Sequence, residues 1–544
     1  MKMKHPVLIA LIVFAAFCCS SQAEKPLFSE NAYEAHLKFL ADDLLEGRSP
    51  GVRGGDLAAL YIAGRFEEAG LLPISETDGY YQKVPLHCAV TDYGSATLTL
   101  SSQNHRLDLK PVEEALINSE LPDEEIRLDD ELLFCGYGIE APEFGRDDFK
   151  GIDIKNRVVV MLCGEPDFEK TGFPSESLTY YGTWTYKEEI CRLKGAKGLI
   201  LLHSDKLLGI EFPPIRNVLS GGHFLFESQM TNLFALYAWI TESALNKALA
   251  PVGLNFDQLI DKAESPDFTP APLGLKVEAA FQQRHRKLSS PNVIGYIPGT
   301  SMDDEAIVIM AHYDHLGIGP EVEGDSIYNG AYDNASGTAG LICLARAFAG
   351  HPAKRRLIFL ATTFEEKRMR FGSEYYVAHP LVPLDKTVIA LNMDGLELYG
   401  RGVGFRMFPI QFTDAVPTAE RLAEEMGLKL QVDGPDRAGS TFLFDNHPFI
   451  AHGVVALRLR LAGDYETRTL DEVEELEKKI GPTYHQPNDE IYPFFRYDGA
   501  IQELEILTRV ARFYADGTQR PSMIPEHPFA VPEEVRKIKV MFSK

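Results

Sequence analysis

The sequence predicts an α/β fold: a mixed, mostly parallel sheet with helices on both faces, interrupted by an inserted β-rich domain. Three observations predict it. After Pro291, apolar runs of five to eight residues alternate with amphipathic segments, as in buried parallel strands separated by helices. Between about residues 96 and 285, short alternating runs indicate strands. From Ser29 to Gly70, apolar residues recur every three or four positions, which indicates helices.

The first 23 residues are interpreted as a signal peptide. Two lysines precede an apolar run from Pro6 to Phe17, and Ser21-Gln22-Ala23 has the small residues of a cleavage site. The apolar run is shorter than the roughly 20 residues of a transmembrane helix, and no later stretch qualifies. We therefore expect an exported protein, periplasmic or secreted, in preference to an uncleaved anchor or a lipoprotein.

The 544 residues include 54 Lys and Arg against 79 Asp and Glu, for a formal net charge of -25. Loss of the two lysines of the signal peptide would make the charge more negative still. Such a charge argues against non-specific binding to nucleic acid or to an anionic membrane. The 45% of hydrophobic residues excludes disorder as the main state. The five cysteines after residue 23 have no paired spacing, so neither a disulfide framework nor a cysteine-ligated zinc site is expected.

The elements follow one another in three blocks. Residues 24–95 contain two helices, punctuated by Gly47, Gly51, Gly54 and Gly55, and form the N-terminal part of the core domain. Residues 96–285 form the insertion, and residues 286–520 complete the core domain before a tail at 521–544. Strands of the insertion are expected at Ala96–Leu100, Glu131–Cys135, Arg157–Leu162 and Gly198–Leu202. Core strands are expected at Ala306–Met310, Leu357–Thr362, Val388–Met393 and Val454–Leu461, and helices at Ala335–Phe348, Ser373–Ala378 and Thr418–Glu425.

Ionisable side chains follow the predicted core strands at their carboxyl ends, where open α/β sheets bind their ligands. They are His312 after the first strand, Glu365 and Glu366 after the second, Asp394 after the third, Asp333 before a helix and His485 in a later loop. Each alone could be a cap or a surface residue. Together they would place several acids at one buried edge, where they repel one another unless cations compensate.

Mixed imidazole and carboxylate ligands favour two Zn²⁺ ions. In the arrangement that we expect, His312 and Asp394 hold one ion, Glu366 and His485 hold the other, and Asp333 bridges both. Three carboxylates and a bridging hydroxide then balance the charge of the two ions.

Glu365 is left without a metal and lies beside a ligand, so we expect it to act as general base and then as proton donor. Asp314 follows His312 by two positions, and period-two alternation predicts that its carboxylate orients that imidazole. The same alternation predicts that His315 points away and has a structural role.

The chain resembles the di-zinc exopeptidases of the M28 peptidase family. The segments that carry the resemblance are "AHYDHLG" at 311–317, "NGAYDNASGTAG" at 329–340, "TFEE" at 363–366, "NMD" at 392–394 and "YHQPND" at 484–489. "FLADDLLEGRSPGVRGG" at 39–55 resembles the start of the same domain, and residues 130–205 resemble the protease-associated domain inserted in many members.

The resemblance implies a zinc-exopeptidase fold of the phosphorylase/hydrolase type. It also implies His312, Asp333, Glu366, Asp394 and His485 as zinc ligands, with Asp333 bridging, and Glu365 and Asp314 as catalytic residues. Tyr484 falls where some members place a tyrosine that binds the oxyanion; its alternative is ordinary packing beside His485.

Two segments depart from the family pattern. Arg368 stands where a glycine is usual, and Gly372-Ser373 come one residue late. Phe444-Asp445-Asn446 stands where Ser-Asp-His is common. Neither departure touches a ligand, so they are expected to change the pocket wall and substrate specificity rather than the chemistry.

The expected function is that of an aminopeptidase that cleaves peptides by attack of a metal-bridging hydroxide, with Glu365 as the base. A carboxypeptidase or dipeptidase on the same ligand set remains open, and a non-catalytic receptor-like homologue is the third alternative. Side-chain preference and oligomeric state are not specified by the sequence.

Overall fold

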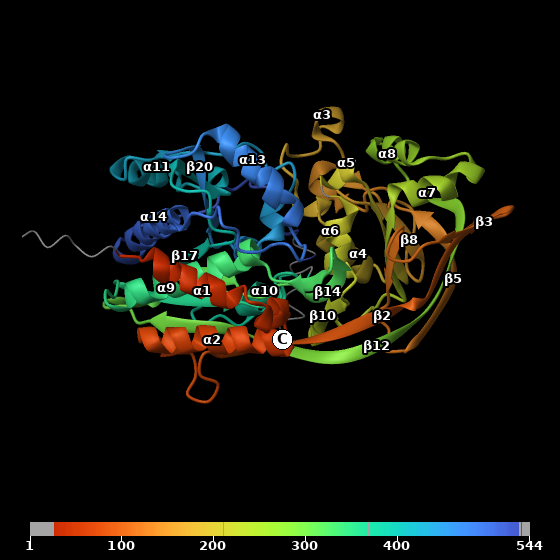
Figure 1. Ribbon diagram of the computed structural model, residues 1–544. Helices are drawn as coiled ribbons and strands as arrows, with labels where there is room; N and C mark the ends of the chain where they lie inside the picture. Colours follow the sequence, from red (N-terminus) through yellow and green to blue (C-terminus); the bar gives the residue numbers. More distant parts are fainter. Residues whose placement is uncertain (1–26, 210, 368–369, 533–534, 536–544) are drawn as a thin grey trace, which may run out of the picture.

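The computed structural model describes residues 27–209, 211–367, 370–532 and 535. In this part of the chain, 16 strands form one mixed sheet that runs through both parts of the molecule (Figure 1). The predicted signal peptide, Arg368 and most of the last 12 residues lie outside the described residues.

The centre of the sheet consists of four parallel strands in the order β20, β17, β13, β16. Their bounds are β13 Met302–His312, β16 Arg355–Thr362, β17 Thr387–Asn392 and β20 Ala456–Tyr465. Antiparallel strands flank them: β18 (Gly402–Phe408) beside β20, and β12 (Ala271–Ile297) beside β16. The predicted mixed, mostly parallel sheet is therefore confirmed.

Alternate residues of the central strands bury opposite faces of the sheet, as strand geometry requires. In β13, Ile307 and Ile309 belong to one hydrophobic core, whereas Val308 and Met310 belong to the other. The first core is covered by α1 (Glu30–Leu40), α2 (Arg53–Ala69), α9 (Ser336–Ala349) and α14 (Tyr497–Asp516). The second core is covered in part by α10 (Phe371–Ala378) and α12 (Asn446–Ala451). Helices thus lie on both faces, as expected.

The two long strands β2 (Tyr81–Ser102) and β12 pair antiparallel and connect the two parts of the molecule (Figure 1). Residues 96 and 285, the expected bounds of the insertion, fall inside these strands. The inserted part continues the sheet through β5 (Glu125–Phe134), β8 (Val158–Leu162), β9 (Gly198–His203) and β11 (Leu236–Thr241), which run parallel to one another. Because one sheet passes through both parts, the insertion is anchored directly to the central strands.

Helices as well as strands make up the inserted part, and its α6 lies towards the core domain in the ribbon (Figure 1). The helices are α3 (Phe168–Thr171), α4 (Trp184–Leu193), α5 (Asp205–Leu208), α6 (Phe212–Leu219), α7 (Glu242–Leu249) and α8 (Phe256–Glu264). Its other strands are β3 (His105–Leu109), β4 (Ala115–Asn118), β6 (Glu140–Ala141), β7 (Arg146–Asp147) and β10 (His223–Leu225). The remaining elements are β1 (Leu72–Pro73), β14 (Gly317–Val322), β15 (Asp325–Tyr328), β19 (Lys429–Leu430), α11 (Val416–Glu425) and α13 (Leu470–Ile480).

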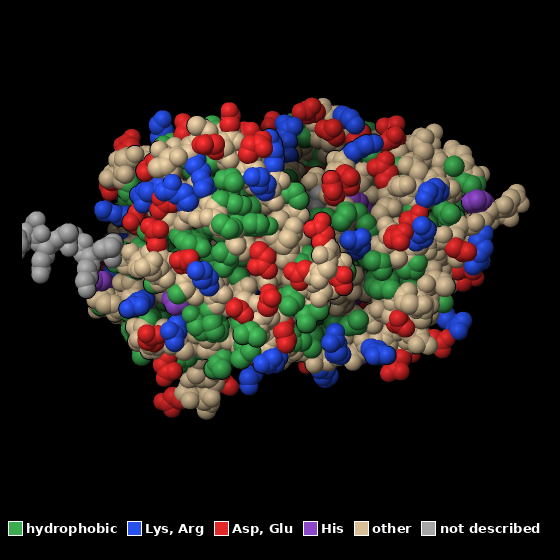
Figure 2. All heavy atoms as spheres, viewed as in Figure 1, with side chains coloured by type: hydrophobic (Ala, Val, Ile, Leu, Met, Phe, Trp, Pro, Cys, Tyr) green, Lys and Arg blue, Asp and Glu red, His purple; other side chains and the backbone are tan. Residues whose placement is uncertain are grey.

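The surface is mixed in charge, with acidic and basic side chains interspersed over the face shown in Figure 2. Among the described residues, no helix combines the length and apolarity that crossing a bilayer requires. Cys88, Cys135, Cys163, Cys191 and Cys343 are buried free thiols.

A buried ionic cluster fixes the core of the insertion. The carboxylate of Glu120, after β4, accepts hydrogen bonds from both terminal nitrogens of Arg192 in α4 and from the backbone N–H of Phe234. His223 in β10 lies with Nε2 2.6 Å from the same carboxylate. Burial favours the protonated acid, but the charges of Arg192 and His223 hold the pKa of Glu120 well below its usual value.

Replacement of Glu120 by alanine is expected to lower the free energy of unfolding by about 3–5 kcal/mol, because it leaves a buried arginine uncompensated. The stabilisation should be complete above the ordinary pKa of a glutamate and decline as the pH falls towards the lowered folded-state pKa. Urea unfolding at pH 7 and pH 4 measures both effects. The exposed pair Glu125 and Arg127 provides the control: Glu125→Ala should cost less than about 1 kcal/mol. Equal losses in the two variants would contradict the assignment.

Candidate active site

The predicted metal-ligating side chains converge at the carboxyl ends of the central strands. His312 is the last residue of β13, Glu366 follows β16 and Asp394 follows β17. Asp333 lies in the irregular turn Ala331–Ala335 that leads into α9, and His485 lies in the loop after α13. All five are buried.

Asp333 lies between the two histidines and presents one oxygen to each. Its Oδ1 is 3.3 Å from His312 Nε2, and its Oδ2 is 3.4 Å from His485 Nε2. Asp394 Oδ2 lies 3.6 Å from His312 Nε2, and Glu366 Oε2 lies 2.9 Å from His485 Nε2. The carboxylate of Asp333 is therefore shared by two pairs of predicted ligands, one at each of its oxygens.

The electrostatics of this cluster fit cations. Burial lowers the pKa of a histidine, yet the surrounding carboxylates raise the pKa of His485 to about 10 and that of His312 well above its usual value. Burial would raise the pKa of Asp333, but hydrogen bonds from both imidazoles hold it well below its usual value. The cluster therefore has a negative potential that attracts protons, and divalent cations would satisfy it. Nitrogen and oxygen donors in this mixture suit zinc.

His315 lies inside the cluster, and the expectation that it points away is wrong. Its Nδ1 is 2.6 Å from Glu366 Oε1, and its ring packs edge-on to that of His485. The alternation rule failed because β13 ends at His312, so the chain at 315 is no longer a strand. His315 therefore contacts one carboxylate oxygen of Glu366, and His485 contacts the other.

Asp314 takes a different position from the one expected. Its backbone carbonyl oxygen, rather than its carboxylate, lies 3.2 Å from Nδ1 of His312. The carboxylate accepts a hydrogen bond of 3.1 Å from the backbone N–H of Glu365, and its Oδ2 is buried with no hydrogen-bond partner among the described residues. Burial raises the pKa of Asp314 to about 7, although the charge of His312 opposes the rise. Asp314 thus orients His312 through the main chain and Glu365 through the side chain.

Two further residues hold the loops that carry the predicted ligands, and the sequence patterns did not single them out. The buried Asp489 accepts backbone hydrogen bonds of 2.9 Å from Tyr332 and 3.0 Å from Asp333. The buried Arg48 donates to the carbonyl oxygens of Tyr313 and Gly330. Both residues stand within segments that resemble the family, "YHQPND" and "LEGRSP", which was the available signal.

The inserted part forms one wall of a cavity of about 110 Å³ beside the cluster. Its lining residues from the insertion are Trp184, Pro214, Ile215, Val218, Leu219 and Trp239, and those from the core are Glu365, Glu366, Arg370, Leu443, Tyr484 and His485. Asn217 of α6 also donates a hydrogen bond of 3.2 Å to the carbonyl oxygen of His485. The insertion therefore contacts a ligand loop directly and narrows access to the cluster.

Tyr484 lines this cavity and is 52% exposed. Its ring stacks on His485 with the centroids 3.8 Å apart. The side chain therefore forms part of the accessible cavity wall, and the role of its hydroxyl group as oxyanion donor stays a prediction.

The segments that depart from the family pattern reach the cavity wall through Arg370 and Leu443. The guanidinium group of Arg458 lies over the ring of Phe444, with Cζ 3.7 Å from the ring centroid. Asp445 is buried and accepts hydrogen bonds from the hydroxyl groups of Thr362 and Ser373.

Residues 292–497 match the family model described as Peptidase family M28. This part of the chain belongs to peptidase family M28. No curated protein matches the sequence. An aminopeptidase from Aneurinibacillus sp. strain AM-1 has a similar fold: it is 18% identical, covers 90% of this chain and 95% of its own, and has a TM-score of 0.53.

Two further solved structures are less similar. A zinc aminopeptidase from Bacillus subtilis is 19% identical, with coverage of 94% of this chain and 100% of its own and a TM-score of 0.47. A peptidase M28 precursor from Shewanella amazonensis is 16% identical, with coverage of 92% and 100% and a TM-score of 0.44.

The M28 domain should lose metal affinity when Asp489 is replaced. Asp489→Ala removes both acceptors of the Tyr332 and Asp333 backbone groups, and loss of such supporting contacts typically weakens metal binding about 10- to 100-fold. Competition titration of the purified protein with a zinc chelator measures the change. Glu490→Gln alters the next residue, which bonds Asn329 instead, and should leave zinc affinity within about threefold. Equal affinities of wild type and Asp489→Ala would exclude this positioning role.

Proposed function

We propose that this chain is an exported zinc aminopeptidase that binds two Zn²⁺ ions per chain. The observation that carries the proposal is the position of Asp333, with one carboxylate oxygen near each of two ligand pairs. His312 and Asp394 would hold one ion, and Glu366 and His485 the other. His315 would keep Glu366 in place.

Zinc, when bound, supplies Lewis acidity for the scissile carbonyl group and lowers the pKa of water. Glu365 lines the cavity beside the ligand Glu366, so it is placed to take the proton of the attacking water and to pass it to the leaving amine. Asp314 fixes the backbone of Glu365 for that transfer. Tyr484 would donate its hydroxyl group to the oxyanion that develops on the substrate carbonyl.

Cleavage from the amino end is supported by the shape of the site and by the aminopeptidase from Aneurinibacillus, whose fold is similar. A cavity of about 110 Å³ with one wall formed by the insertion favours a single terminal side chain over an extended chain on both sides. Export rests on the predicted signal peptide at residues 1–23, and peptides are the expected substrates.

The direction of cleavage can be tested with blocked peptides. We expect zinc-loaded protein to hydrolyse free and C-terminally amidated peptides, and N-acylation to abolish cleavage, because the free amine identifies an aminopeptidase substrate. Liquid chromatography of the products measures the effect. Cleavage that survives N-acylation but not amidation would instead establish a carboxypeptidase.

Glu365→Gln should lower kcat by about 10² or more, because the amide cannot accept the proton of the attacking water. Zinc content by mass spectrometry should be unchanged, since Glu365 is not a ligand in the proposed set. The exposed Glu475→Gln serves as the control and should keep full activity. A wild-type protein that binds no zinc, together with a silent Glu365→Gln substitution, would favour the receptor-like alternative.

A further inference from the structure

Arg370 is a buried cation with an unsatisfied guanidinium group. It is 6% exposed, and its Nε is buried without a hydrogen-bond partner. Among the described residues, no ion pair or hydrogen bond reaches its side chain. A buried charge in this state is costly unless an anion compensates it.

The backbone of Arg370 is fixed at the start of α10. Its carbonyl oxygen accepts hydrogen bonds of 3.1 Å from the Ser373 hydroxyl group and from the Glu374 backbone N–H. Its φ of 48° is in the left-handed region, which a non-glycine residue occupies at a cost. The side chain is therefore presented from an ordered helix terminus.

Arg370 lines the cavity beside the proposed zinc site, together with Glu365, Glu366 and His485. The wall contributed by the insertion is apolar, with Trp184, Ile215 and Trp239 among its members. A molecule in this cavity would therefore meet an arginine in mainly apolar surroundings close to the reacting groups. There, a bidentate pair with a carboxylate is stronger than in water.

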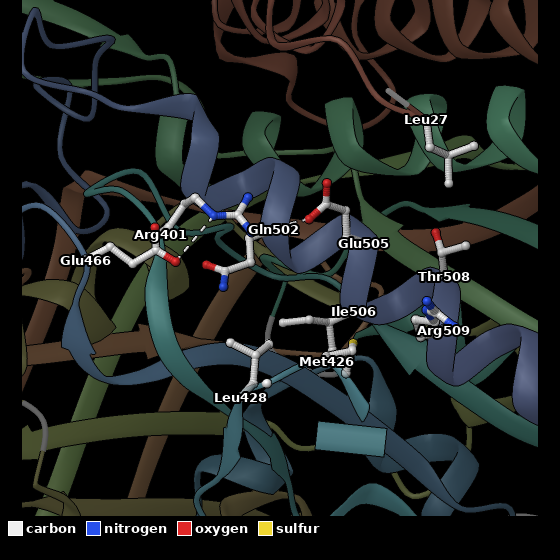
Figure 3. Close-up of a pocket in the computed structure, with 11 residues that line it drawn as sticks. Leu27, Arg401, Met426, Leu428, Glu466, Gln502, Glu505, Ile506, Thr508 and Arg509 are labelled. Atoms are coloured by element: carbon white, nitrogen blue, oxygen red, sulfur yellow. Dashed lines mark ion pairs between the residues drawn. The ribbon is translucent and has the colours of Figure 1, made fainter. Parts of the chain in front are cut away.

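A second groove contains an arginine whose charge is paired with carboxylates of this chain. In the groove of Figure 3, Arg401 forms ion pairs with Glu466 at 3.6 Å and with Glu505 at 3.5 Å. The charge of Arg401 is compensated within the chain, so this arginine does not need an anionic ligand. Arg370 has no such pair.

We propose that Arg370 binds a carboxylate group of the substrate, so that the enzyme prefers peptides that place an anion in this cavity. This inference rests on the proposed peptidase function. The carboxylate has two sources in a peptide, an acidic side chain at the amino-terminal residue or the free carboxyl terminus of a dipeptide.

Two matched peptide pairs distinguish these sources. Glu-Ala-amide against Gln-Ala-amide isolates the acidic side chain, and Leu-Ala against Leu-Ala-amide isolates the free carboxyl terminus. The kinetics of each peptide are measured with zinc-loaded wild type, Arg370→Gln and Arg370→Lys. Arg421→Gln serves as the control, because Arg421 is an exposed partner of Glu425 in α11.

We expect wild type to prefer the carboxylate member of one pair. Arg370→Gln should lower kcat/KM for that peptide about 10- to 100-fold, mainly through KM, and change its amide partner less than about threefold. Arg370→Lys should restore part of the preference, because it keeps the charge without the planar fork. Both substitutions keep a side chain that is unbranched at Cβ. The energetic cost of the left-handed backbone conformation at position 370 is therefore the same in both variants.

Calorimetric binding of the four peptides to Glu365→Gln protein, with and without Arg370→Gln, separates the two proposals. Hydrolysis without any preference that depends on Arg370 overturns this inference and leaves the peptidase function standing. Binding of a carboxylate peptide through Arg370 without hydrolysis in wild type overturns the function and leaves the inference standing. Absence of both binding and hydrolysis overturns both.

Discussion

The burial of several carboxylates at one edge of the sheet is the constraint on which the rest of the structure depends. Asp333, Glu366 and Asp394 are buried within a few ångströms of His312 and His485. Like charges at such distances repel, and the desolvation of each adds to the cost. The fold offsets this cost only partly with imidazoles and backbone donors. The remaining negative potential fits the proposed binding of cations, and the loops that carry these carboxylates must be held together against their mutual repulsion.

The loops are held by contacts between segments that are far apart in the sequence. Arg48, from the segment before α2, donates to the carbonyl oxygen of Tyr313, two residues before His315, and to that of Gly330, just before the turn that carries Asp333. Asp489 fixes the Asp333 turn from the loop that also carries His485. Neither residue contacts the reacting groups. They maintain a geometry that the repulsion between the carboxylates would otherwise open.

The central sheet, and the convergence of the predicted ligands at one edge of it, could be predicted from the sequence because both depend on local patterns. Apolar runs fix β13, β16 and β17, and the carboxyl ends of parallel strands must meet at one edge. The predictions for Asp314 and His315 failed because the alternation of side chains along β13 ends with the strand. His315 comes after β13 has ended, so alternation gave the wrong direction, and Asp314 reaches His312 through its carbonyl group. The roles of Arg48 and Asp489 depend on tertiary contacts that no spacing reveals.

The shared strands β2 and β12 also explain how chemistry and selectivity can be separated in this fold. The predicted ligands come from strand ends and loops of the core, whereas the cavity wall comes largely from α6 and its neighbours in the insertion, with Arg370 and Leu443 from the core. Because the insertion continues the same sheet, its wall is connected through β2 and β12 to the strands beside the predicted ligands. Substitutions in the wall are therefore expected to change which side chain or terminus fits while leaving the predicted metal ligands in place. Both departures from the family pattern lie beside residues of the cavity wall. At these positions a substitution is expected to affect the reaction rate less than a substitution of a predicted ligand.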